Sequence, residues 1–218
     1  ARRAAERGMT MKLIGVTLLL AASVLSSPLG ASVKDELTAI QPLQFKDADG
    51  AFVNSCTAWK TIVSDGTVWV TALHCLTDDA GVLILDRPWF INGTSARVGN
   101  ANSRTDLVTL RGSAKGHSLR VAYGPPEVLA PLWTAGYPRG SKARYALAGV
   151  LSQPRADNGK AVFNMPTTNG MSGAPVLDKD GLVVGLMLQM ECHPVAGWCA
   201  VSRGASVADL REFLFGEA

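Results

Sequence analysis

The chain has 218 residues, 47% of them hydrophobic and 18% charged, which is typical of a globular protein of one or two small domains. This length is enough to bury a sizeable core without help from a metal. The formal charge of +3 comes from residues 1–31, where four basic residues stand against one acidic residue, while the rest holds 17 of each and no basic stripe that would suggest a nucleic-acid partner.

The N-terminal segment has the layout of a secretory signal. Lys12 precedes the apolar run 13–25, and small residues with a helix-breaking proline follow it. We predict a leader over residues 1–31, cleaved after Ala31 or Ser26, and hence a secreted or periplasmic protein. The alternative is a membrane anchor, because the uncharged stretch runs for 21 residues and could span a bilayer of about 30 Å. In that case the protein would contact a membrane through its uncleaved leader.

The body of the chain is predicted to be all-β. We assign no element to residues 32–49, but from residue 50 onward short runs rich in β-branched and apolar residues alternate with turn residues. The predicted strands are 68–72, 82–86, 106–110, 131–136, 160–165, 174–177 and 182–188. This spacing, without helical periodicity between the runs, indicates antiparallel barrels or a sandwich. The stretch 123–131 is rich in proline and glycine and is the predicted linker between an N-terminal domain, 32–122, and a C-terminal domain, 132–218.

One helix is predicted after the leader, at the C-terminal end. Ser206 begins the segment SVADLREFLFG and Asp209 stands three residues on, as in a capping box. Val207, Leu210 and Leu214 recur on one face. We expect this helix to dock on a barrel.

The four cysteines agree with export. They are Cys56, Cys75, Cys192 and Cys199, and they form no C-x-x-C pair typical of zinc or redox sites. Three connectivities are possible in an oxidising compartment. We favour Cys56–Cys75 and Cys192–Cys199, because each pair brackets a segment with the pattern of two neighbouring strands. Four free buried thiols would fit poorly with the leader.

A serine between two glycines is the first candidate catalytic residue. Ser172 lies in TTNGMSGAP, between Gly170 and Gly173. A serine hydroxyl is a weak nucleophile until a general base removes its proton. Of the three histidines, His74 directly follows an apolar strand, whereas His117 and His193 lie in segments predicted to be solvated loops.

A carboxylate is needed to orient the histidine. Asp106 opens the run DLVTL, and alternation would place it on the same face as Val108 and Leu110. An acidic residue that faces inward is costly unless it has a partner. The alternatives Asp78, Asp79 and Asp86 fall in a polar turn or at a surface strand end.

Together these segments resemble the chymotrypsin-like serine proteases. TALHC is similar to the histidine signature of that family, TDLVTL to its aspartate strand, and GMSGAPVLDKDGLVVGL to its nucleophile segment. The order His74, Asp106, Ser172 is the family's order and differs from that of subtilisins and α/β-hydrolases. GYPRG (136–140) and LAGVLS (147–152) also resemble strands that open the second barrel in short bacterial and viral members. The resemblance covers residue 50 to the C-terminus and implies two antiparallel six-stranded β-barrels.

The resemblance also implies roles. Ser172 would be the nucleophile, His74 the base and Asp106 the residue that holds its tautomer, with the N–H groups of Gly170 and Ser172 as the oxyanion hole. Met171 stands where pancreatic-type members carry an aspartate that binds the new N-terminus, so activation through that ion pair is not expected. Ala174 replaces the usual second glycine, as in short members.

The substrate pocket is implied in the same way. Pro166 and Thr167 would lie at its base, with Met187, Leu188 and Gln189 along its wall. Since these positions carry no acidic residue and no histidine, we expect an apolar or small P1 side chain.

The leading prediction is therefore a secreted, monomeric serine endopeptidase that acts on protein or peptide substrates. Two alternatives keep the fold: a membrane-tethered viral polyprotein protease, which Thr167–Gly173 also resembles, and an inactive protease-like binding protein. An esterase is disfavoured because a hairpin pattern, not a helix, follows the serine. Scattered histidines and the lack of a glycine-rich phosphate loop predict no metal and no cofactor.

Overall fold

The computed structural model describes residues 31–139, 141–156, 158–191 and 201–217. Residues 1–30 of the predicted leader and the predicted Cys192–Cys199 pair lie outside these ranges. The elements in chain order are α1 (Ala31–Thr38), β1 (Ile40–Lys46), β2 (Phe52–Val63), β3 (Gly66–Ala72), the 3-10 turn η1 (Leu73–Leu76), β4 (Trp89–Ile91), β5 (Thr94–Asn102), β6 (Leu107–Gly112), β7 (Pro131–Gly136), β8 (Tyr145–Gln153), β9 (Ala161–Asn164), β10 (Pro175–Leu177), β11 (Val183–Glu191), β12 (Val201–Ser206) and α2 (Val207–Phe215). None of the described helices is both long and apolar enough to cross a membrane.

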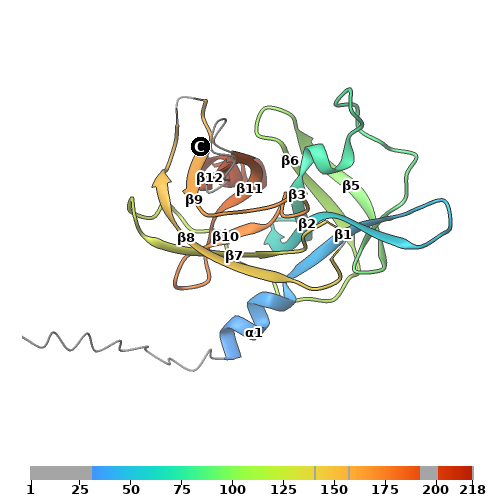
Figure 1. Ribbon diagram of the computed structural model, residues 1–218, viewed down its shortest axis with the longest axis horizontal. Coiled ribbons are helices and arrows are strands. Elements are labelled where there is room, and N and C mark those ends of the chain that lie inside the picture. Colours follow the sequence, from blue (N-terminus) through green and yellow to red (C-terminus); the bar gives the residue numbers. More distant parts are fainter. Residues whose placement is uncertain (1–30, 140, 157, 192–200, 218) are drawn as a thin grey trace, which may run out of the picture.

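The strands form two closed antiparallel barrels of six strands each, which confirms the predicted fold class. The first barrel has the order β1-β2-β3-β6-β5-β4, and the second repeats it as β7-β8-β9-β12-β11-β10. The two barrels lie side by side, with α1 below the place where they meet and the C-terminal end beside the second barrel (Figure 1). A closed barrel leaves no open sheet edge, so each half satisfies its backbone hydrogen bonds internally.

The segment that connects the barrels also joins their sheets. Residues 113–130 run from β6 to β7. Leu119 forms a parallel bridge with Thr61 of β2, and Val121 forms one with Val183 of β11. The buried Thr61 hydroxyl donates to the Leu119 carbonyl at 2.8 Å. The connection is thus hydrogen-bonded to both barrels.

Two hydrophobic clusters make up the core. One fills the first barrel around Trp69, Ile91 and Leu110, all almost fully buried. The other contains Trp59 of the first barrel and Phe163 of the second, so it extends across the contact between them. Apolar burial at this contact fixes the barrels against each other and sets the geometry of whatever lies in the cleft between them.

Most predicted strands are confirmed, but one is wrong. β3, β6, β7, β9, β10 and β11 lie on the predicted runs 68–72, 106–110, 131–136, 160–165, 174–177 and 182–188. Residues 82–86 form no strand and contribute a single bridge, between Leu83 and Thr77. Leu83 and Ile84 pack on the first-barrel core, while Leu85 is 74% exposed, so this apolar run covers the histidine loop instead of pairing in a sheet.

Other elements went unpredicted. The unassigned stretch 32–49 contains most of α1 and all of β1, and β2, β4, β5 and β12 match no predicted run. These strands carry polar residues on one face or are very short, so their composition gives a weak strand signal.

The predicted C-terminal helix is confirmed with its cap. The Ser206 hydroxyl accepts from the Asp209 N–H, and the Asp209 carboxylate accepts in return from the Ser206 N–H. Gly216 ends the helix at a φ of 70°. Val207 and Leu210 are buried where α2 packs on the second barrel.

Candidate active site

His74 is presented by a short turn at the end of a buried strand. β3 ends at Ala72, and the 3-10 turn η1 follows at once, so the imidazole emerges at the barrel rim. The next residue, Cys75, forms a disulfide with Cys56 of β2, as predicted. The histidine is therefore held on one side by a strand and on the other by a covalent link to a second strand.

Loss of this disulfide should loosen the histidine loop. We expect Cys56→Ser to lower the free energy of unfolding by about 2–5 kcal/mol, as removal of a native disulfide commonly does. Urea denaturation of the oxidised parent and of Cys56→Ser would measure the change, with Cys75→Ser as the matched variant that breaks the same bond. Equal stability of parent and variants would contradict a structural role for this bridge.

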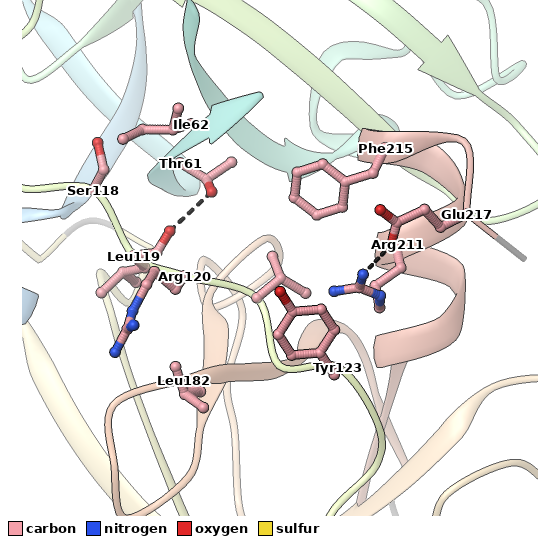
Figure 2. A pocket seen from close by; sticks show the side chains of 11 residues that line it. Thr61, Ile62, Ser118, Leu119, Arg120, Tyr123, Leu182, Arg211, Phe215 and Glu217 are labelled. Carbon is pink, nitrogen blue, oxygen red and sulfur yellow. Dashed lines mark hydrogen bonds and ion pairs between the residues drawn. The ribbon is translucent and has the colours of Figure 1, made fainter. Parts of the chain in front are cut away.

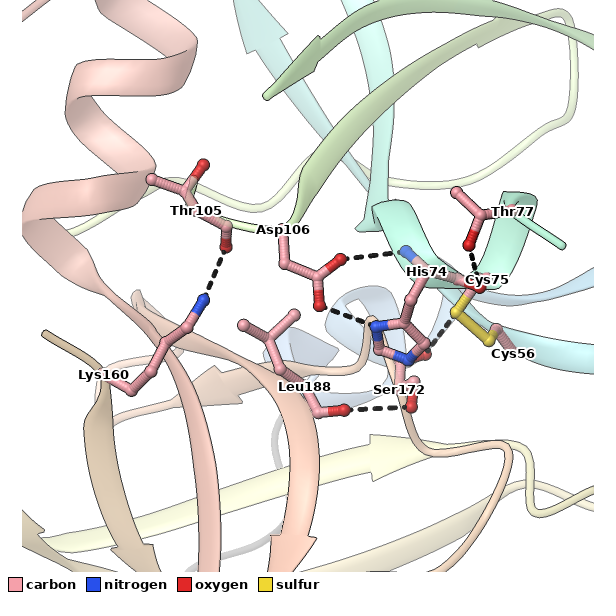
Figure 3. Close-up of polar contacts among 9 residues, drawn as sticks. All are labelled: Cys56, His74, Cys75, Thr77, Thr105, Asp106, Lys160, Ser172 and Leu188. Atoms are coloured by element: carbon pink, nitrogen blue, oxygen red, sulfur yellow. Dashed lines mark hydrogen bonds and ion pairs between the residues drawn. A yellow bond between two sulfur atoms is a disulfide. The ribbon is translucent and has the colours of Figure 1, made fainter. Parts of the chain in front are cut away.

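Asp106 reaches His74 from a turn and not from a strand, which corrects the expected position. It precedes β6 and has a φ of 59°, in the left-handed region that non-glycine residues seldom adopt. Its Oδ1 accepts from the His74 backbone N–H at 2.9 Å, and its Oδ2 lies 2.7 Å from His74 Nδ1. The two contacts fix the imidazole in a single orientation, with Nε2 turned away from the carboxylate (Figure 3).

The other candidate carboxylates and histidines lie elsewhere. Asp78 accepts from the N–H groups of Ala80 and Val82 within its own turn, and Asp79 and Asp86 are exposed. His117 is exposed in a loop, as expected, and His193 falls outside the described residues.

Ser172 lies in a tight loop before β10. Gly170 and Gly173 on either side have φ of 93° and 84°, a conformation that favours glycine. The Ser172 hydroxyl donates to the Leu188 carbonyl at 3.3 Å, and no hydrogen bond joins it to His74 among the described residues. Both side chains nevertheless line the same two pockets, one on each side of the serine.

Within the described residues, the backbone N–H groups of the serine loop alternate between bonded and free. Those of Met171 and Gly173 donate to backbone carbonyls at 3.0 and 2.7 Å. For Gly170 and Ser172, no acceptor is found within the part of the chain that the structure describes. Two neighbouring donors thus remain available next to the serine hydroxyl, which is the composition of an anion-binding pocket.

Thr57 of β2 holds the serine loop in place and was not anticipated from the sequence. It is fully buried, its N–H donates to the Ser172 carbonyl at 2.9 Å, and its hydroxyl donates to the Gly170 carbonyl at 3.0 Å. These bonds connect the first barrel to a loop of the second. A threonine inside a strand gives no sequence signal for such a role.

A pocket of about 280 Å³ opens beside the serine. Its lining residues are His74, Thr167, Thr168, Asn169, Met171, Ser172, Met187, Leu188, Gln189 and Met190. It contains four of the five predicted pocket positions, Thr167, Met187, Leu188 and Gln189, whereas the exposed Pro166 lies outside the lining. Its described walls carry methionines and no acidic side chain.

A separate pocket of about 380 Å³ lies at the C-terminal helix, away from these residues (Figure 2). Tyr123, Arg211 and Phe215 line it, and Arg211 stacks on both aromatic rings. It contains none of His74, Asp106 and Ser172. Among the described residues, no group of three or more His, Cys, Asp or Glu side chains could hold a metal ion. The cleft around His74 is therefore the candidate active site.

Comparison with known proteins agrees with this geometry. The family profile of the trypsin-like peptidase domain matches residues 56–186, which is more than half of the chain and contains the histidine, aspartate and serine segments. The chain belongs to the trypsin-like peptidase family. It is accordingly a serine endopeptidase, with peptides as substrates.

Solved structures share the fold of this trypsin-like peptidase at low sequence identity. The active form of the Rv3671c protease from M. tuberculosis superposes with a TM-score of 0.63 at 15% identity, over 86% of this chain and 84% of that one. A serine endoprotease from Yersinia pestis gives a TM-score of 0.64 at 13% identity, over 83% of this chain and 63% of that one. No curated protein matches the chain.

Proposed function

We propose that this trypsin-like peptidase cleaves peptide bonds with Ser172 as nucleophile, His74 as general base and acid, and Asp106 as the residue that orients the imidazole. The observation that carries the proposal is the pair of contacts from one carboxylate to His74, at 2.9 Å to its N–H and 2.7 Å to Nδ1. They leave Nε2 as the nitrogen that can take a proton from a serine across the pocket.

The reaction begins with a rotation of the serine side chain. The Ser172 hydroxyl leaves the Leu188 carbonyl and turns to His74 Nε2, a rearrangement of the kind that substrate binding often completes. Oγ then attacks the scissile carbonyl carbon while Nε2 takes its proton. The imidazolium passes this proton to the leaving amine, and water hydrolyses the acyl-enzyme by the same route.

The N–H groups of Gly170 and Ser172, which have no acceptor among the described residues, stabilise the oxyanion of the tetrahedral intermediate. The adjacent N–H groups of Met171 and Gly173 already donate to backbone carbonyls, so the loop is rigid where the charge develops. Loss of one such donor commonly costs about 3 kcal/mol of transition-state stabilisation.

The methionine-lined pocket receives an apolar P1 side chain. Met171 and Met187 are almost completely buried, and Met190 is half-buried at the pocket wall. Thioether side chains fill irregular space and accept varied apolar groups. The peptidase works in an oxidising compartment, outside the cytosol, as its Cys56–Cys75 disulfide favours.

Covalent labelling of residues 32–218 with a fluorophosphonate probe tests the proposal. We expect peptide mapping to find the label on Ser172, and expect His74→Ala to remove it, because the hydroxyl needs the imidazole as base. Ser172→Ala serves as the unlabelled control. Folded protein that takes up no label would refute the proposed triad and favour a protease-like binding protein.

A further inference from the structure

A second pocket adjoins the P1 pocket on the far side of His74. It has a volume of about 280 Å³, and its lining residues are His74, Asp106, Lys160, Leu188, Gln189 and Arg203. We propose that this pocket binds an acidic side chain of the substrate, on the acyl side of the scissile bond. This inference rests on the proposed function, because it takes Ser172 as the point from which substrate positions are counted.

Lys160 brings the first positive charge. Its Nζ lies 3.1 Å from the Thr105 carbonyl, so the half-buried side chain of one barrel is held against the segment of the other that carries Asp106 (Figure 3). An ammonium has three N–H donors, and this contact uses one. Within the described residues no carboxylate lies at ion-pair distance from it.

Arg203 of β12 contributes the second positive charge of this pocket. Its Nε donates to Glu191, which is not part of the pocket lining. The side chain of Arg203 is 26% exposed, so water screens its charge only partly. The guanidinium has further N–H groups that this ion pair does not use, and they match the oxygens of a carboxylate.

Asp106 is the one acidic side chain among the lining residues, and it is already engaged. Both of its oxygens accept hydrogen bonds from His74. Gln189 is exposed and adds an amide donor, for which no partner is found among the described residues. Among the described residues, the N–H groups of this pocket that have no partner belong to Lys160, Arg203 and Gln189. Two of these residues are cations, which suits an anionic side chain.

The geometry of an extended peptide selects the substrate position. This pocket shares His74, Leu188 and Gln189 with the P1 pocket, so the two adjoin along the same stretch of β11. Side chains of an extended chain alternate in direction. With P1 in the methionine-lined pocket, P2 and P4 point toward Lys160 and Arg203, and an aspartate or glutamate at one of them is preferred.

Paired peptide substrates test this preference. Substrates with methionine or leucine at P1 are made with glutamate or glutamine at P2, and separately at P4. We expect the glutamate peptide to have the higher kcat/KM at one of these positions, by about tenfold at low salt, with the ratio falling as salt screens the charges. Lys160→Met and Arg203→Met should each lower the ratio, and together bring it near one.

Controls separate charge from folding. Lys179→Met removes an exposed cation of the β10–β11 hairpin and should leave the ratio unchanged, while Lys160→Arg should keep it. Fluorophosphonate labelling of Ser172 reports on each variant's active centre independently of P2 and P4. A normal label with equal kcat/KM for glutamate and glutamine at both positions overturns this inference alone, as does a preference that survives the double substitution. A parent without label overturns the proposed function as well.

Discussion

Asp106→Asn is expected to lower kcat by about four orders of magnitude at neutral pH with little change in stability. Oδ1 of Asp106 faces a backbone N–H, so an asparagine keeps its carbonyl oxygen there. Its NH₂ group then faces His74 Nδ1, in place of Oδ2. A donor at this point forces the tautomer with its proton on Nε2, and that nitrogen can no longer accept the serine proton.

The matched control is Asp78→Asn. Asp78 lies shortly after the turn that carries His74. Its carboxylate accepts hydrogen bonds from two backbone N–H groups of its own turn, a role that asparagine can keep. We expect its kcat to stay within about twofold of the parent, since it lies outside the proposed triad. Steady-state hydrolysis of a peptide ester, normalised to the folded fraction, measures both. If Asp78→Asn lost activity and Asp106→Asn kept it, the assignment of the carboxylate would be wrong.

The sequence predicted the barrels well where strands are apolar on both faces. β7 and β11 are flanked by turn residues and carry continuous apolar runs, which makes their signal strong. β5, by contrast, holds only one buried residue, Ala96, in nine positions, so composition could not separate it from a loop. The prediction of a strand at 82–86 is wrong for the opposite reason. This loop is apolar, so its composition is the same as that of a strand.

The sequence predicts the main residues of the candidate site, but it does not predict the residues that hold them in place. His74, Ser172 and the flanking glycines stand out by local context, since a nucleophile loop of this shape requires positive φ. Thr57 of the first barrel holds the serine loop of the second, and Lys160 of the second barrel holds the Asp106 segment of the first. Such contacts depend on how two barrels dock, and no local pattern encodes them.

The same docking makes Gly173, beside the serine, a position that tolerates no side chain. A Cβ at Gly173 would lie 2.2 Å from the Thr57 carbonyl oxygen and 2.2 Å from Thr71 Oγ1, both in the first barrel. Neither atom can withdraw easily, because the Thr71 hydroxyl donates to that same carbonyl at 2.7 Å within the β2–β3 sheet. A methyl group would therefore push the barrels apart and break the Thr57–Ser172 backbone bond.

We expect Gly173→Ala to lower the free energy of unfolding by about 3–5 kcal/mol, from backbone strain at a φ of 84° and overpacking against a rigid sheet. Gly93→Ala is the matched control: its φ is 78°, but apart from its chain neighbours no described residue has an atom within 4 Å of the added Cβ, so strain alone should cost about 1–2 kcal/mol. Urea denaturation gives the difference between the two, which isolates the steric contact between barrels. Fluorophosphonate labelling of the folded fraction should also fall for Gly173→Ala and not for Gly93→Ala. Equal losses of stability would mean that the serine loop does not press on the first barrel, and would contradict the role given to Thr57 in holding that loop.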